Sequence, residues 1–224
     1  AIVLGTDGLK RGHGGDVSVT NSGRLVSTGS SSSALVVQSI GGGGGIARRL
    51  GTDTLSFDLQ LGSTNAEDAS GGNVDVTNNG QGILTTGTYA RPILVQSIGG
   101  GGGWITANVG AATEALLGTT AAGGNTSGGA VSVTNNSTLT SLGTGAAGLV
   151  AQSIGGGGGV VGNEAGTVVM GSVGSSGRAS GGSVDLTNTA AITTKGTDAP
   201  AAFAQSIGGG GGRSNDIAGD LRMG

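Results

Sequence analysis

The amino-acid sequence predicts an all-β fold, a parallel β-helix or β-solenoid of about four repeats of about 55 residues each. Three observations predict it: two motifs recur along the chain, apolar and polar residues alternate between them, and Gly, Asn and Ser cluster where strands would turn. Glycine makes up 53 of the 224 residues. Collagen is excluded, because glycine does not occupy every third position and there are only 2 prolines.

Two motifs delimit each repeat. The second glycine of GGxVxxTN precedes the glutamine of QSIGGGGG by 23 or 24 residues in every repeat, whereas the stretch from QSIGGGGG to the next GG varies in length. We expect one array over residues 1–224, with repeat units at 5–61, 62–117, 118–170 and 171–223. Because the chain opens on AIVLG and closes on DLRMG, at the same phase of the repeat, we also expect it to be a fragment of a longer protein.

Alternating hydrophobicity predicts about four short strands in each repeat. The first follows the GG motif, where Val17 and Val19 alternate with polar residues, and the second begins at Leu25. The third runs from Val36 to Ile40, and the fourth, at 55–61, alternates Leu, Phe, Leu and Leu with polar residues. The segment ATEALL, at 112–117, is the nearest to a helix pattern, but it occupies the position of the fourth strand.

The length of the repeat is compatible with two ordinary solenoid coils or with one long, flattened coil. We expect two coils per repeat, which would add roughly 10 Å of height per repeat and roughly 40 Å for four repeats at the spacing of β-strands.

Repetition places like residues side by side along a solenoid axis, where amide side chains can hydrogen-bond in ladders. One ladder is expected at the turn asparagines Asn21, Asn78, Asn135 and Asn188. A second is expected at Gln38, Gln96, Gln152 and Gln205, which share strand parity with the isoleucines Ile40, Ile98, Ile154 and Ile207. If the isoleucines point inward, the glutamines do too, and each buried amide needs a partner, either its own kind or turn backbone. A row of glycan-binding glutamines is the functional alternative.

The polyglycine segments are expected to be ordered and partly buried. A linker would vary in length, but every copy has five glycines behind the same Gln-Ser-Ile. Without Cβ atoms, these segments can approach another backbone closely, and we expect that backbone to belong to the next repeat. Trp104 and Ile105, which follow the second polyglycine, are expected in the core or as its partial cover rather than as a sugar-binding platform.

No catalytic, cofactor or metal site is expected. An outward row of Ser18, Asp75, Ser132 and Asp185 separates its carboxylates by a whole repeat, which favours a solvated face over a calcium ladder. Asp58 and Asp75 are conceivable as a glycosidase pair, but their spacing does not distinguish them. His13 is the single histidine, and the chain has no cysteine.

Charge and hydropathy exclude two classes of partner. Lys and Arg number 10, scattered along a chain of net charge -3, so we expect no nucleic-acid partner. No apolar run is long enough for a membrane-spanning helix, so we expect no membrane insertion by this segment.

A longer pattern, GGxVxVTNxGxIxTxGxxAxxLxxQSIGGGGG, is matched at 14–45, 71–103, 128–159 and 181–212. It resembles the repeats of bacterial type V secreted proteins, the autotransporter passengers. The resemblance implies a right-handed β-helix that is exported through the outer membrane to the cell surface or beyond. It also implies an adhesin or a surface fibre.

We therefore expect a structural or adhesive repeat region of a bacterial cell-surface or secreted fibre, acting as a rigid rod and a multivalent binding surface rather than as an enzyme. Its expected partners are neighbouring repeats or copies of itself, stacked end to end or laterally, and a host or surface glycan. Two alternatives stay open. A carbohydrate-active β-helix enzyme would need a unique acidic cluster in one repeat. An ice-binding solenoid is favoured by threonine pairs such as Thr85-Thr86 and Thr193-Thr194.

Overall fold

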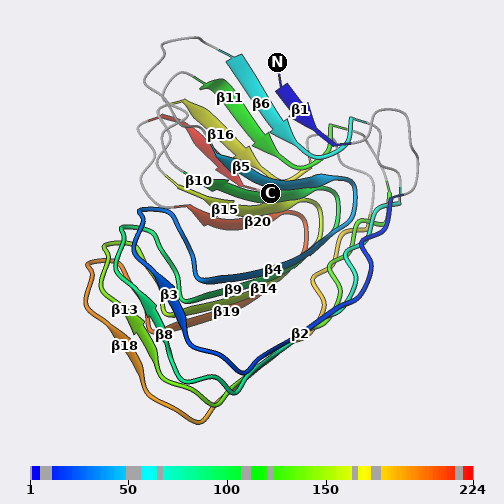
Figure 1. Cartoon of the computed structure of the whole chain (residues 1–224). Coiled ribbons are helices and arrows are strands. Elements are labelled where there is room, and N and C mark those ends of the chain that lie inside the picture. The colour runs from blue at the N-terminus through cyan, green and yellow to red at the C-terminus, as the bar shows by residue number, and fades with distance from the viewer. Residues whose placement is uncertain are drawn as a thin grey trace.

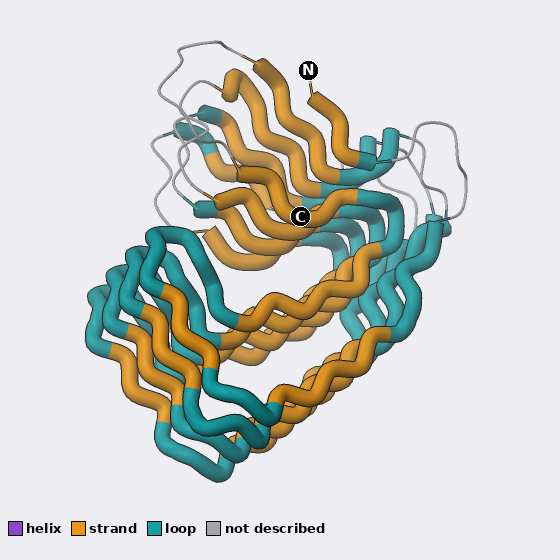
Figure 2. Tube along the Cα trace, viewed as in Figure 1, coloured by secondary structure: helices purple, strands orange, loops and turns teal. Residues whose placement is uncertain are grey.

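A computed structural model describes residues 2–5, 12–48, 57–64, 68–106, 112–120, 124–162, 166–172, 178–214 and 219–223. Over these ranges the chain forms strands joined by turns, and the strands stack parallel and in register (Figures 1 and 2). This arrangement confirms the predicted all-β parallel solenoid. In the described ranges the chain has no helix that is long and apolar enough to cross a membrane.

Five parallel sheets make up the described part of the solenoid, and each is named here after its strand in the first coil. The β2 sheet contains β2 (Val17–Asn21), β7 (Val74–Asn78), β12 (Val131–Asn135) and β17 (Val184–Asn188). The β3 sheet contains β3 (Leu25–Ser27), β8 (Ile83–Thr85), β13 (Leu139–Ser141) and β18 (Ile192–Thr194). The β4 sheet contains β4 (Leu35–Ile40), β9 (Ile93–Ile98), β14 (Leu149–Ile154) and β19 (Ala202–Ile207).

The remaining two sheets lie beyond the polyglycine segments. The β5 sheet contains β5 (Gly44–Arg48), β10 (Gly102–Thr106), β15 (Gly158–Val161) and β20 (Gly211–Ser214). The β6 sheet contains β1 (Ile2–Leu4), β6 (Phe57–Leu61), β11 (Ala112–Leu117), β16 (Thr167–Met170) and β21 (Leu221–Met223). ATEALL is therefore a strand, as expected, and residues 55 and 56 of the predicted fourth strand lie outside the described ranges.

Each repeat forms one coil, so the expectation of two coils per repeat was wrong. Val74 of the second repeat pairs directly with Val17 of the first and with Val131 of the third, and no other strand lies between them. One repeat therefore adds a single strand spacing, about 4.8 Å, and four coils rise about 20 Å rather than about 40 Å. The coil is wide because it contains five strands, one more than predicted.

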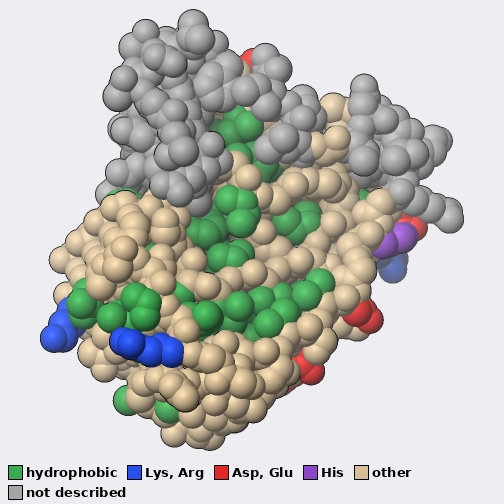
Figure 3. All heavy atoms as spheres, in the orientation of Figure 1, with side chains coloured by type: hydrophobic (Ala, Val, Ile, Leu, Met, Phe, Trp, Pro, Cys, Tyr) green, Lys and Arg blue, Asp and Glu red, His purple; other side chains and the backbone are tan. Residues whose placement is uncertain are grey.

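The coil folds into layers that enclose three apolar cores among the described residues. The β2 and β3 sheets close with one face of the β4 sheet around the largest core, which includes Val76, Ile83 and Val95. The opposite face of the β4 sheet packs on the β5 sheet around Leu94 and Trp104. The far face of the β5 sheet packs on the β6 sheet in a third core. Hydrophobic side chains appear in bands across the end of the stack that Figure 3 presents.

The polyglycine segments make the sharp turn from the β4 sheet to the β5 sheet. In every copy the second and third glycines have φ of 83° to 101°, and the fourth and fifth have φ of 125° to 139°. Residues with a Cβ rarely adopt these angles. Because the same conformation returns in all four coils, the segment is a specified structural element, as predicted, and not a linker.

Close backbone contact on two sides explains why the turn has no side chains. A Cβ built on Gly102 would lie 2.9 Å from the carbonyl carbon of Gly158 in the next coil and closer still to its oxygen. A Cβ on Gly157 would lie 2.5 Å from the Cα of Gly118, which follows a strand of the β6 sheet. The turn thus packs against the neighbouring polyglycine, as expected, and also against the glycine that ends the β6-sheet strands.

The strand of the β5 sheet is the one that the sequence pattern did not predict. Its first two residues are glycines, which have a low intrinsic preference for strands. They pair with the same glycines of the next coil, as Gly102 does with Gly44 and Gly158. Tertiary stacking therefore supplies the extended conformation that the local sequence disfavours.

Candidate functional site

A ladder of glutamine side chains runs through the layer between the β4 and β5 sheets. Each amide donates from Nε2 to the Oε1 of the glutamine in the next coil, over 2.7 to 2.9 Å. The structure thus brings together the four predicted glutamines, Gln38, Gln96, Gln152 and Gln205, and pairs them with one another. Gln96 and Gln152 have no exposed surface, so the middle of this row offers nothing to a glycan in solution.

Replacing one member of the ladder should destabilise the protein more than replacing all four. Gln96→Met leaves the Nε2 of the half-buried Gln38 and the Oε1 of the buried Gln152 without partners. An unpaired buried group costs about 1–3 kcal/mol, and a half-buried one costs less. We expect the free energy of unfolding to fall by about 2–4 kcal/mol, measured by urea denaturation with circular dichroism. Replacing all four glutamines by Met leaves no orphaned amide and should cost less. A quadruple variant less stable than the single one would contradict the ladder as the source of the effect.

The predicted asparagines form a second ladder at the ends of the β2-sheet strands. Nδ2 of each asparagine donates to Oδ1 of the next, over 2.6 to 2.8 Å, through Asn21, Asn78, Asn135 and Asn188. The same amides also bind the turn that follows them; Asn135, for example, donates to the carbonyl of Ser137 over 2.8 Å. One side chain thus joins neighbouring coils and holds the turn to the β3 sheet.

The serines of the first three QSI motifs join consecutive coils at the opposite end of the β2-sheet strands. Ser97 Oγ donates to the carbonyl of Gly72 over 2.7 Å and accepts the N–H of Gly129 over 2.8 Å. Ser39 and Ser153 make the same pair of contacts in their own coils. Sequence reasoning missed this role, although serine follows glutamine in every repeat.

The isoleucines of the motif stack directly on one another. Ile40, Ile98, Ile154 and Ile207 occupy the same register position of the β4 sheet. The two central ones, Ile98 and Ile154, are fully buried. The QSI triplet therefore contributes a hydrogen-bonding amide and a stacked isoleucine in every coil, and a bridging hydroxyl in the first three coils. All three roles concern the stacking of coils.

The outer face of the β2 sheet is polar and regular. Ser18, Asp75, Ser132 and Asp185 share one register position, so aspartate alternates with serine in successive coils. An open groove of about 340 Å³ crosses this face, lined by Asp16, Val17, Ser18, Asn73, Val74, Asp75, Ala130 and Ser132. Two of its polar groups already bind backbone: Asp16 accepts the N–H of Asn73 over 2.7 Å, and Asn73 Oδ1 accepts that of Ala130 over 2.9 Å.

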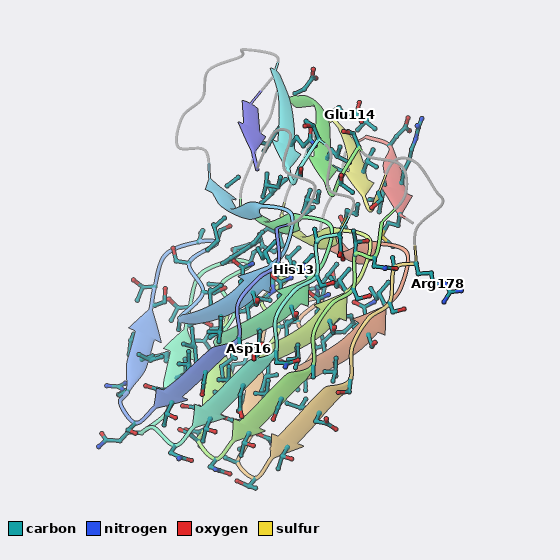
Figure 4. All side chains as sticks on the ribbon, turned by 90° about the vertical axis from the view of Figure 1, so that its right-hand side faces the viewer. His13, Asp16, Glu114 and Arg178 are labelled. Carbon is teal, nitrogen blue, oxygen red and sulfur yellow. The ribbon has the colours of Figure 1, made fainter. Side chains whose placement is uncertain are left out.

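The acidic residues and the histidine that the structure describes do not converge on one centre. Asp58 and Asp75, considered above as a pair, lie in different sheets, and Asp58 instead has Glu114 as its register neighbour in the β6 sheet. Both of these carboxylates are exposed. His13, which precedes β2, accepts the N–H of Ser70 over 3.2 Å. Figure 4 shows His13, Asp16, Glu114 and Arg178 spread over the side of the stack. Among the described residues no group of three His, Cys, Asp or Glu could hold a metal ion.

Among the residues that the structure describes, clear pKa shifts belong to two arginines that border the layer between the β4 and β5 sheets. Burial lowers the pKa of the Arg91 guanidinium to about 9, and the positive charge of Arg213 contributes in the same direction. Burial also lowers the pKa of Arg213, while the charge of Asp198 opposes that shift. Sequence reasoning did not select these residues, since each repeat has a different residue at their positions.

Comparison of the chain with protein-family models, with curated proteins and with solved structures finds no match in any of the three.

Proposed function

We propose that this chain is a structural and adhesive repeat region of a bacterial cell-surface or secreted fibre, a rigid rod that presents a repeated binding surface. One observation carries the proposal: four coils of the same five-strand outline stack in register, with the same residues at the same positions. Identical units at a fixed spacing build length and multivalency without new contacts.

The coil-to-coil contact supports the rod. It combines backbone hydrogen bonds with the Asn, Gln and Ser contacts, and in each of them a donor on one coil meets an acceptor on the next. A contact of this kind is directional and can be repeated, because each coil has unused donors and acceptors that match those of the following coil. Partners of this surface are therefore further coils of the same repeat, within a longer chain or in another copy.

The outer face of the β2 sheet supports the binding surface. Its hydroxyl and carboxylate groups recur at about 4.8 Å along the axis. They line an open groove rather than an enclosed pocket, which suits an extended ligand such as a surface glycan better than a small molecule.

Binding of the full chain, displayed on beads, to a glycan panel and to bacterial and host cells tests the proposal. We expect retention that grows with the density of the chain on the bead. Changing Asp75 and Asp185 to Ser should reduce retention, whereas the matched control Asp58→Ser, exposed on the β6 sheet, should not. Absence of retention on every surface would contradict adhesion. Release of reducing ends from a polysaccharide, abolished by Asp58→Asn with Glu114→Gln, would establish the enzymatic alternative.

An ice-binding face is the second candidate, because one complete row of threonines stacks on the outer face of the β2 sheet. Its members are Thr20, Thr77, Thr134 and Thr187. The pairs considered from the sequence do not form such a face, since Thr85 is fully buried. Thermal hysteresis of the purified chain, the difference between the melting and freezing temperatures of ice, tests this candidate. A difference that Thr77→Lys abolishes would support an ice-binding face, and the absence of any difference would contradict it.

A further inference from the structure

Two arginines place their guanidinium groups over aromatic rings between the β4 and β5 sheets. The Cζ of Arg91, two residues before β9, lies 5.8 Å from the ring centroid of Trp104 on β10. The Cζ of Arg213 on β20 lies 5.6 Å from the ring centroid of Phe203 on β19. One arginine thus belongs to the second coil and the other to the fourth. Each guanidinium lies over an aromatic ring, an arrangement that leaves its edges available for hydrogen bonds.

The intervening third coil has small residues at both positions. Ala147 lies two residues before β14, as Arg91 does before β9, and Val160 pairs with both Trp104 and Arg213 in the β5 sheet. Both small residues are fully buried. No side chain of the third coil at these positions can neutralise the two positive charges.

Arg91 has one edge without hydrogen-bond partners. Its Nη1 donates to the carbonyl of Tyr89 over 3.3 Å, but Nε and Nη2 are buried and have no partner. These two nitrogens form a single edge of the guanidinium, the edge that holds carboxylate, sulfate or phosphate through two parallel hydrogen bonds. Buried donors are rarely left unpaired, and a buried charge without a counter-charge is still more unfavourable.

Arg213 supplies a second positive charge on the more open side of the cluster. It is partly buried, and its Nη2 donates to the carbonyl of Asp198 over 3.0 Å. Its positive charge contributes to the lowered pKa of the Arg91 guanidinium. A buried guanidinium edge with two unpaired donors is an arrangement that an anion would stabilise, and a second positive charge favours the same ligand.

We propose that Arg91 and Arg213 form a binding site for an oxyanion group, a carboxylate, sulfate or phosphate, at the junction of the β4 and β5 sheets. The anion accepts two hydrogen bonds from Nε and Nη2 of Arg91 and faces the charge of Arg213. This proposal is independent of the adhesive function, because the site lies at a different sheet from the outer groove.

Trp104, the single tryptophan of the chain, serves as the reporter. The full chain is titrated with sodium acetate, sodium sulfate and inorganic phosphate, at an ionic strength held constant with sodium chloride. We expect a saturable change in tryptophan fluorescence and a rise in melting temperature with at least one oxyanion, and neither with chloride alone. The anion that binds most tightly shows whether the site prefers a carboxylate, a sulfate or a phosphate group.

Three variants and one matched control complete the test. Arg91→Met and Arg213→Met should abolish the saturable response, and Arg91→Lys, which keeps the charge but loses the two-donor edge, should weaken binding at least about tenfold. Arg24→Met, at an exposed arginine, should leave the response unchanged. A response that persists in Arg91→Met, or that chloride reproduces, would overturn the site and show an adventitious ion only. If Arg91→Met does not fold, Arg213→Met and Arg91→Lys decide the question by the same criteria.

Discussion

Gly102→Ala is expected to lower the free energy of unfolding by more than about 4 kcal/mol, enough to unfold many domains of marginal stability. The new Cβ would overlap the carbonyl of Gly158 in the next coil, and both partners are backbone atoms within a sheet. Relief requires that two coils separate, which breaks hydrogen bonds along the β5 sheet. The residue would also have to adopt a φ of 135°, which side chains disfavour.

Gly45→Ala separates the cost of the clash with the next coil from the cost of the unfavourable φ. Gly45 has nearly the same backbone angle, a φ of 129°, but a Cβ built there meets no atom within 4 Å. We expect this variant to lose only the conformational part, about 1–2 kcal/mol. Urea denaturation of both variants, followed by circular dichroism, measures the difference. Equal losses would mean that backbone angle, and not contact between coils, explains the glycines.

Arg91→Met is expected to raise the free energy of unfolding by about 1–4 kcal/mol in a buffer that contains chloride as its only added anion. Arg91 has no exposed surface, and two of its nitrogens are unpaired, so its charge opposes folding. Methionine keeps much of the apolar contact with Trp104 and removes the charge. The control Arg24→Met, on the surface, should change stability by less than about 0.5 kcal/mol. A destabilised Arg91→Met variant would show that the charge has a partner in solution.

The stabilisation expected for Arg91→Met should depend on pH, because the pKa of Arg91 is lowered in the folded chain. In the unfolded chain the guanidinium has its ordinary, higher pKa, whereas in the folded chain its pKa is lowered to about 9. Between these values the unfolded state binds more protons, so the stability of the native protein rises with pH in this window. The advantage of Arg91→Met should be complete below pH 9 and shrink above it. An advantage that stays constant up to pH 11 would contradict the assignment to Arg91.

Much of the stacking could be predicted from the sequence, because it depends on repetition. Equal spacing from the GG motif to QSI places each amide at the same point of its coil, so Asn135 meets Asn78 and Gln152 meets Gln96. Alternation identifies which residues face inward, and constant length indicates that the glycines are ordered. These are local or periodic properties, and one chain displays them directly.

The number of coils per repeat could not be predicted, since the same strands fit one wide coil or two narrow ones. The difference lies in pairing across 53 to 58 residues, for which the local pattern carries no signal. The β5-sheet strand was missed for a similar reason, because stacking of Gly44 on Gly102 overrides the low strand preference of glycine. Likewise, only the register of the β6 sheet shows that the carboxylates Asp58 and Glu114 are neighbours.

By itself the sequence determined the solenoid class, the phase of its repeat, and the residues that stack as amide and isoleucine rows, since repetition forces like residues into register. Only the tertiary structure decided that one repeat makes one coil, that the polyglycine turn packs on the glycines after the β6-sheet strands, and that Arg91 is buried with two unpaired nitrogens. The physical reason is the same in each case. Sheet pairing and layer packing join residues far apart in the chain, and a buried charge acquires its environment from those neighbours.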